Sequence, residues 1–413
     1  METLHVVPFL VTITLWTGIA LVLVIGLFGL IFEVLVASGT DKDNLFNVFR
    51  IAGLTTVLGA VIALPLTVIR LRLTQEQTTL AQKQTDIARE SLFNEKINAA
   101  TQGLYARRQV TEWHRQKGYV DHWQDDIVQR CAAIDRLEGL ARENNAETPR
   151  IARLLSVYVC ELSSDVQPHA PPSDATSKEL RNWARQLPKP RSDMEKAAQT
   201  LGRLHKFALS PLDNGEIDLR GANLQKCNLK ELAFDEALFI GAQLQGAELW
   251  GAKLRGANLS HAKLQGADLW QAKLHRAELW DAKLQGADFS GAELQRAILI
   301  RAELQRAELY DAKLQGANLS HAKLQGVNLN AAKLDGKIPL IGTVLHGAAV
   351  KEVDFTKAPQ ITKHLNDVFG DGTTTLPTGV ERPDHWTTEN LKYPEFLTQW
   401  RVWQATLEEG WDE

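Results

Sequence analysis

Two long apolar segments stand near the start of the chain. No charged residue occurs in 6–32, and a second uncharged run covers 51–69. The first is long enough to cross the ~30 Å hydrocarbon layer as a tilted helix, and the second is near the minimum length for a crossing. We therefore predict a two-span transmembrane helical hairpin over residues 1–72. The polar turn between the spans contains Asp41, Lys42 and Asp43.

Charged residues around the two runs predict an orientation. The positive-inside rule places the side of the membrane with more Lys and Arg in the cytoplasm. The residues that follow the second run are Arg70, Arg72, Lys83 and Arg89, against Lys42 and Arg50 near the turn. The C-terminal bulk and the N-terminus are then both cytoplasmic. The alternative is a pair of buried helices in a soluble domain.

The start of the chain does not resemble a cleaved signal peptide. A signal peptide has a basic beginning and an apolar stretch of about 7 to 15 residues. Here the chain begins Met-Glu-Thr-Leu-His and its apolar run is longer. We expect the segment to be retained.

Residues 73–210 follow a helical pattern. Leu73, Leu80 and Ile87 recur at seven-residue spacing, which fits either an oligomerising stalk, and hence a homo-oligomer, or a solvated helix continuing from the second span. Apolar residues at helical spacing predict two amphipathic helices between 127 and 159. A linker rich in Pro and Ser at 165–177 precedes a further helical stretch, interrupted at Pro188 and Pro190.

A period of five dominates the second half of the chain. Stepping by five from Leu219 to Leu334, 21 of 24 positions are Leu and the others are Phe; two residues earlier, 20 of 24 are Ala. At 3.6 residues per turn, successive leucines would lie about 140° apart around a helix, so no helix face could bury them. In a straight strand they would alternate between faces. A chain that turns a corner every five residues points every Leu inward.

Four such corners close a coil of about twenty residues, which stacks on the next at the strand spacing of ~4.8 Å. Segments such as Ala247-Glu248-Leu249-Trp250-Gly251 and Ala257-Asn258-Leu259-Ser260-His261 resemble the pentapeptide-repeat family, with consensus Ala-Asp/Asn-Leu-x-x. The resemblance implies a right-handed quadrilateral β-helix. The flanking Asp193–Arg203 and Val368–Thr373 segments and the order of parts resemble bacterial membrane-anchored members, implying an inner-membrane location and no common activity.

The predicted solenoid domain is 211–360. A loop at 335–342 interrupts the repeat, which resumes one position out of phase at Ala348 and Val350. Open ends would expose unpaired strand edges, so we expect residues before Asp218 to cap one end and a tail, 361–413, to cap the other.

Residues twenty apart form columns on the predicted surface. One column holds Trp250, Trp270, Ser290 and Tyr310, and Trp280 lies on a different face. Exposed aromatic clusters are typical of protein interfaces, and stacking between coils is the equally weighted alternative. The candidate interaction surface consists of Trp250, Trp270, Trp280 and Tyr310.

Charge narrows the choice of partner. Residues 217–336 contain 15 Lys or Arg and 14 Asp or Glu, and the whole chain of 413 residues has a formal net charge of -4. DNA mimicry that inhibits a topoisomerase, known for some similar solenoids, needs a strongly acidic surface, and DNA binding needs a basic one. We expect no nucleic-acid partner.

No catalytic or cofactor motif appears, so we predict a protein that is not an enzyme and has no cofactor. Three cysteines cannot form a disulfide framework, and His114, His122, Asp125 and Asp126 lack metal-ligand spacing. The leading hypothesis is a membrane-anchored scaffold for an unidentified cytoplasmic or membrane protein. The alternatives are a channel-like oligomeric assembly in the bilayer and, less favoured, topoisomerase inhibition.

Overall fold

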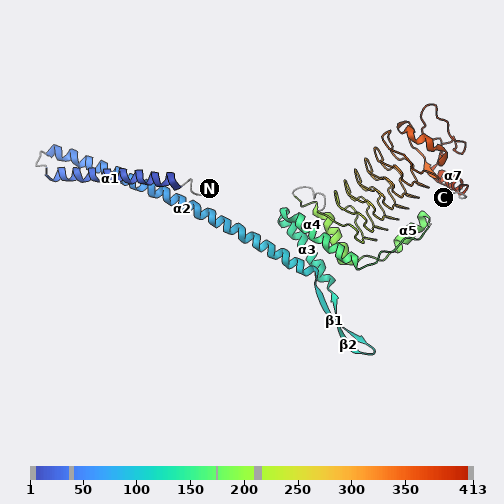
Figure 1. The fold of residues 1–413 in the computed structure, drawn as a ribbon, viewed down its shortest axis with the longest axis horizontal. Helices are drawn as coiled ribbons and strands as arrows, with labels where there is room; N and C mark the ends of the chain where they lie inside the picture. Colours follow the sequence, from blue (N-terminus) through green and yellow to red (C-terminus); the bar gives the residue numbers. More distant parts are fainter. Residues whose placement is uncertain (1–5, 37–40, 174, 209–215, 408–413) are drawn as a thin grey trace. The chain divides into compact units, whose positions relative to one another are not determined.

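The computed structural model describes residues 6–36, 41–173, 175–208 and 216–407 (Figure 1). The chain divides into two compact units, the first ending at Glu95 and the second beginning at Lys96. Each unit is described by itself below.

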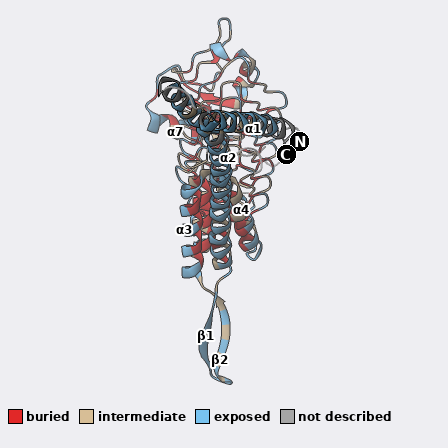
Figure 2. Ribbon diagram, turned by 90° about the vertical axis from the view of Figure 1, so that its left-hand side faces the viewer, coloured by how far each residue is buried: buried red, intermediate tan, exposed pale blue. Residues whose placement is uncertain are grey.

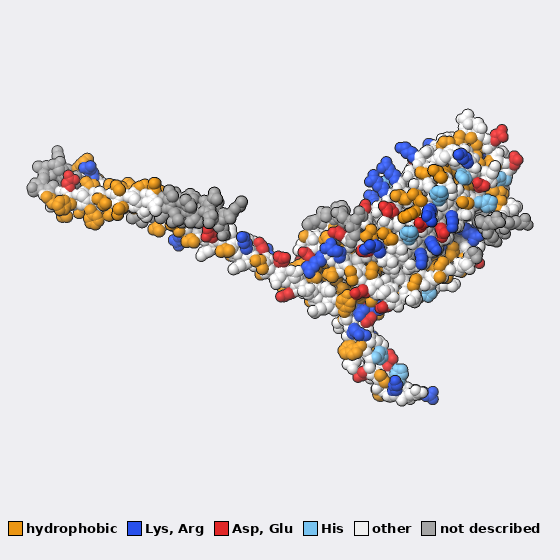
Figure 3. All heavy atoms as spheres, in the orientation of Figure 1, with side chains coloured by type: hydrophobic (Ala, Val, Ile, Leu, Met, Phe, Trp, Pro, Cys, Tyr) orange, Lys and Arg blue, Asp and Glu red, His pale blue; other side chains and the backbone are white. Residues whose placement is uncertain are grey.

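The first unit contains two helices, α1 (Val6–Val36) and most of α2 (Asp41–Leu104). Both are long and apolar enough, by length and composition, to cross a bilayer. Their apolar side chains are exposed and form much of their visible surface in Figure 3. In water such a surface would be costly, because exposed apolar area is unfavourable.

The predicted polar turn is displaced. The backbone is already helical from Asp41, so Asp41, Lys42 and Asp43 form the first turn of α2. The connection between the helices lies in 37–40, outside the described residues.

Helix α2 continues without a break past the apolar stretch. Leu73, Leu80 and Ile87 lie on this extension, and each is more than half exposed. The structure therefore has the helix that both interpretations of this segment require. Whether a second copy covers these leucines stays a prediction.

A β-hairpin follows α2, within the region expected to be helical. β1 (Arg107–His114) pairs antiparallel with β2 (Gly118–Asp125), from Arg107 opposite Asp125 to His114 opposite Gly118. Gly118 closes the turn with φ of 73°, a conformation that favours glycine. The hairpin is rich in β-branched and aromatic residues, which favour strands.

The second unit has a small helical core. Helices α3 (Ile127–Glu143), α4 (Thr148–Ser164) and α6 (Ser192–Leu204) pack together, with a 3₁₀ turn η1 (Asn145–Glu147) between the first two. The two amphipathic helices predicted between 127 and 159 are confirmed, and the buried side of α3 is visible in Figure 2. Helix α5 (Ser177–Gln186) is separated from α6 by the segment that contains Pro188 and Pro190.

A buried polar network ties the hairpin to this core. The Arg191 guanidinium contacts Asp193 at 2.8 Å and Asp125 at 3.0 Å, and the Tyr158 hydroxyl donates to Asp193 at 3.0 Å. Burial disfavours the charged form of Asp193, but the hydrogen bond and charge of Arg191 outweigh it and hold the pKa of this carboxyl below its usual value.

The five-residue period builds a solenoid of short parallel bridges. They join residues twenty apart, from Asp218 with Leu238 to Lys313 with Lys333. The Leu, Phe and Ala positions of the repeat are almost all buried, as predicted. Every fifth residue from Gly221 to Ala331 has a positive φ, between 52° and 69°. This left-handed residue turns the chain once per repeat, which explains the many glycines at that position.

Both ends of the solenoid are covered within the second unit. At the first coil, α6 approaches so closely that a Cβ on Gly202 would lie 2.6 Å from Leu232 Cβ. At the far end, β3 (Ala348–Val350) pairs in parallel with β4 (Val368–Gly370). Two 3₁₀ helices, η2 (Phe355–Lys357) and η3 (Pro359–Asp367), connect these strands, and α7 (Tyr393–Ala405) follows.

The out-of-phase resumption of the repeat is visible in the pairing. After the loop, Lys323 bridges Val344 and Asn328 bridges Ala349, twenty-one residues apart instead of twenty. Asp354 bridges Thr375 in the same way, so the winding continues beyond residue 360. Phe369, Phe396 and Trp400 form the core of the covering tail.

Candidate interaction surface

Two of the four predicted aromatic residues form a stack on the outside of the solenoid. The rings of Trp250 and Trp270 lie 5.6 Å apart between centroids and are inclined by 10°. Trp270 is 39% exposed and Trp250 is half-buried. Both side chains follow a buried Leu in adjacent coils, so the backbone spacing itself brings the rings together.

The other two predicted residues do not join this stack. Ser290 separates Trp270 from Tyr310, whose ring meets that of Tyr393 in the tail, 6.0 Å away. Trp280 belongs to another column and packs beside His261 at 5.5 Å. The structure therefore reduces the predicted aromatic surface to one stacked pair and two separate aromatic side chains.

Ion pairs form within three charged columns on the solenoid. Lys313 lies 3.0 Å from Glu293, and Lys323 lies 3.1 Å from Glu303, each one coil away. The hydrogen bond and charge of Lys313 lower the pKa of the Glu293 carboxyl. In a third column Arg301 contacts Asp281 at 3.1 Å. Each of these pairs joins opposite charges that lie one coil apart.

A column of glutamines went unnoticed in the sequence. In one column the residue after Leu is Gln in six successive coils: Gln225, Gln245, Gln265, Gln285, Gln305 and Gln325. The Oε1 atoms of the last five are buried and have no hydrogen-bond partner. The sequence could have indicated this column, because these glutamines recur every twenty residues, which is the length of one coil.

The predicted linker lies against this column. We call residues 165–176 the strap; position 174 is outside the described residues. The first glutamine holds its backbone twice, because His169 N–H donates to Gln225 Oε1 at 2.9 Å and Gln225 Nε2 donates to His169 O at 2.7 Å. Farther along, Arg306 Nη1 donates to Ala175 O at 3.0 Å.

Helix α5 continues from the strap and packs on the same side of the solenoid. A Cβ on Gly246 would lie 2.9 Å from Ala184 O, and one on Gly266 would lie 3.0 Å from Ala184 Cβ. The salt bridge between Arg181 and Glu308, at 3.5 Å, adds a polar contact. These glycines permit the close approach of the helix.

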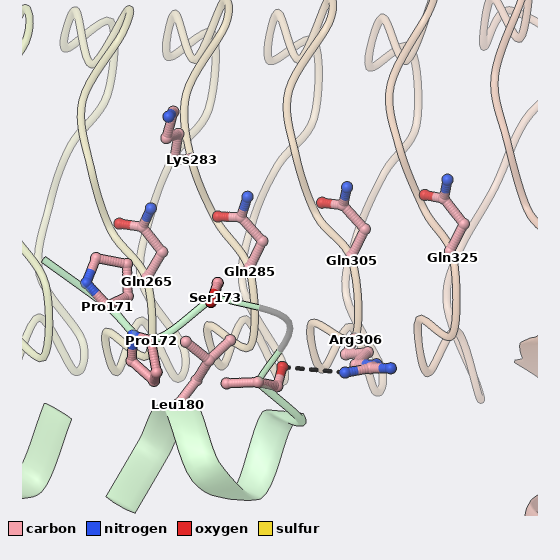
Figure 4. Close-up of a pocket in the computed structure, with 11 residues that line it drawn as sticks. Pro171, Pro172, Ser173, Leu180, Gln265, Lys283, Gln285, Gln305, Arg306 and Gln325 are labelled. Atoms are coloured by element: carbon pink, nitrogen blue, oxygen red, sulfur yellow. Dashed lines mark hydrogen bonds between the residues drawn. The ribbon is translucent and has the colours of Figure 1, made fainter. Parts of the chain in front are cut away.

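Between the strap, α5 and the glutamine column lies a groove of about 440 Å³. Figure 4 shows the carboxamides of Gln265, Gln285, Gln305 and Gln325 side by side along it, each from a successive coil. Pro171, Pro172 and Leu180 form part of its opposite wall. The volume is within the range of pockets that hold small ligands or peptide segments.

Among the described residues, the thiols are not activated as nucleophiles. Burial raises the pKa of all three thiols, and for Cys160, with the Asp218 carboxylate adding to the effect, to about 11. Thiolates are therefore scarce at neutral pH. Of the metal candidates, Asp126 caps α3 and Asp125 is bound to Arg130. Within the described ranges, no group of three or more His, Cys, Asp or Glu could hold a metal ion.

Comparison with known protein families identifies the same five-residue repeat. A family model for pentapeptide repeats (8 copies) matches residues 217–256, 252–291, 277–316 and 302–336. No curated protein matches the chain.

Several solved structures are similar to part of the chain. HetL, a pentapeptide repeat protein involved in heterocyst differentiation regulation in Nostoc sp. strain PCC 7120, is 25% identical over 42% of this chain and 81% of its own, with a TM-score of 0.20. QnrB1, a plasmid-mediated fluoroquinolone resistance protein, is 15% identical over 38% of this chain and 79% of its own, with a TM-score of 0.22. Rfr23, a pentapeptide repeat protein from the cyanobacterium Cyanothece 51142, is 31% identical over 30% of this chain and 63% of its own, with a TM-score of 0.13.

The family model and the coil geometry concern the same residues. The matched segments run from 217 to 336, and bridges between residues twenty apart run through that range. Residues 217–336 therefore form a right-handed β-helix of the pentapeptide-repeat family.

Proposed function

We propose that this chain is a non-enzymatic scaffold that holds its solenoid, four-sided in section, at the cytoplasmic face of a bacterial inner membrane. Helices α1 and α2 would act as the two spans, with both termini in the cytoplasm. Their exposed apolar surfaces support this placement, because a bilayer would cover them. The basic residues that follow the second apolar run support the orientation.

The stacked pair Trp250 and Trp270 carries the proposal of a binding surface. An exposed aromatic stack held by adjacent coils loses little conformational freedom when a partner covers it. Large aromatic side chains also dominate the energetics of protein interfaces. The balanced charge of the repeat, 15 Lys or Arg against 14 Asp or Glu in residues 217–336, favours a protein partner over a nucleic acid.

Truncating the stack should remove a protein partner. We expect a pull-down from detergent-solubilised membranes to recover a partner with the wild-type chain and to lose it with Trp250→Ala/Trp270→Ala. Trp280→Ala is the matched control, because Trp280 is similarly exposed but lies in another column. Recovery of no partner, or equal recovery with both variants, would contradict the proposal.

Ion flux separates this proposal from a channel. A scaffold reconstituted in liposomes should leave them sealed. Leakage that depends on the chain would favour the channel-like assembly and contradict the scaffold.

A further inference from the structure

The strap follows the glutamine column in a fixed register. His169 pairs with Gln225, and Ala175 binds Arg306, the neighbour of Gln305. The step of six strap residues from His169 to Ala175 thus corresponds to eighty residues, or four coils, along the solenoid, which is three strap residues for every two coils.

This register matches a polyproline II helix. Three residues of that conformation advance about 9.3 Å, and two coils advance about 9.6 Å at the usual strand spacing. Three of the strap residues are Pro168, Pro171 and Pro172, which favour the conformation. A polyproline II backbone makes no internal hydrogen bonds, so its non-proline N–H and C=O groups are available to side-chain amides.

The column continues past the point where it pairs with the strap. Among the described residues of the column, Gln225 makes the double hydrogen bond to the strap backbone, while Gln285 and Gln305 line the groove and their buried Oε1 atoms have no hydrogen-bond partner. A buried polar atom without a partner is unfavourable, and a peptide N–H would satisfy it when the carboxamide rotates to direct its oxygen into the groove. Gln265, next to the strap, is itself more than nine-tenths buried and has the same unpartnered atom.

We propose that this groove binds an extended, proline-rich peptide segment of a partner protein, in the manner shown by the chain's own strap. The peptide runs along the solenoid axis beside the strap. Non-proline residues three apart pair through their backbone with Gln285 and Gln325, as His169 pairs with Gln225, and intervening residues reach Gln305. The prolines fill the space against Pro172 and Leu180.

The strap sequence supplied in trans is the direct probe. A fluorescent peptide with the sequence of residues 166–175 should bind the full-length chain in detergent with a saturable anisotropy change. Gln285→Ala/Gln305→Ala should weaken this binding by about 10-fold or more, as expected from the loss of two amide pairs. A peptide of the same length with glycine at the three proline positions should also bind about 10-fold more weakly, since its extended form is not preorganised.

Gln295→Ala/Gln315→Ala is the matched control. These two glutamines also have buried, unpartnered Oε1 atoms but lie in a different column, outside the groove. We expect this variant to bind the peptide like wild type, and both double variants to keep the wild-type unfolding midpoint. Absence of saturable binding, equal loss in both double variants, or equal affinity for the glycine peptide would overturn the proposal.

The peptide-binding experiment and the pull-down that tests the scaffold proposal can fail independently of each other. The glutamine groove and the Trp250 and Trp270 stack belong to different columns. Failure of the peptide to bind leaves the membrane pull-down as an independent test of the scaffold.

Discussion

Leu279→Asp should prevent residues 217–336 from folding as a stable solenoid. Leu279 is completely buried and has leucines one coil away on both sides, Leu259 and Leu299. Truncating such a leucine to alanine costs about 2–5 kcal/mol, and a carboxylate in the same place adds the cost of burying a charge without a partner. We expect a loss of more than about 5 kcal/mol. Urea unfolding of the full-length chain in detergent, followed by circular dichroism, measures it.

Trp280→Asp is the control for this prediction. Trp280 is the next residue along the chain but points outward and is 44% exposed. The same carboxylate there remains in water, so we expect a change below about 1 kcal/mol. A Leu279→Asp chain as stable as the Trp280→Asp chain would mean that the Leu positions do not form the core.

Asp371→Ala should release the C-terminal tail from the end of the solenoid. The buried Asp371 carboxylate lies 3.1 Å from the buried Lys351 ammonium and accepts hydrogen bonds from Thr373 N–H and Leu391 N–H. Removing one partner of a buried ion pair leaves the other charge uncompensated, which costs about 3–5 kcal/mol. Limited proteolysis after residue 360 and the fluorescence of Trp386 and Trp400, both buried in the tail, should report the release.

Two further variants test whether the lost ion pair causes the destabilisation of the tail. Glu352→Ala removes the other carboxylate near Lys351, but this carboxylate is largely exposed and should contribute less than about 1 kcal/mol. Lys351→Met/Asp371→Leu removes both charges and should recover part of the stability, because no unpaired ammonium remains. Recovery cannot be complete, since the backbone N–H groups of Thr373 and Leu391 lose their acceptor. If Asp371→Ala leaves the tail as protease-resistant as in wild type, the ion pair does not hold it.

The solenoid could be predicted from sequence because its core is encoded by near neighbours. Each Leu points inward only if the residue two positions later turns the chain, and the positive φ at residues such as Gly251 and His261 is that turn. The one-residue offset after the loop could also be predicted from sequence. Val350 and Phe355 each lie one position later than the five-residue series that ends at Leu334 would place them.

The β-hairpin could not be predicted in the same way. Its residues are mostly exposed on both faces, so Val110, Trp113 and Tyr119 do not alternate with polar residues as they would beside a core. Without such alternation, the period that identifies a half-buried strand is missing. Only the strand-favouring composition around Gly118 indicated it.

The surface was only partly predictable. The coil length places Trp250 and Trp270 in one column, and their rings stack in the structure. The docking of the strap on Gln225 depends on contacts between residues more than fifty positions apart. A proline-rich composition indicates an extended chain but does not identify the surface against which it lies.

Spin labels at residues 253 and 333 test the central geometry most directly. The native cysteines would be replaced by alanine, which already occupies the position of Cys227 in most repeats. Both labelled positions are exposed and belong to one column, four coils apart. Stacked coils predict a separation of about 19 Å between the backbone positions, and about half of that for residues 253 and 293. A separation near 120 Å, as in a continuous helix, or distances that do not grow in equal steps per twenty residues would contradict the solenoid.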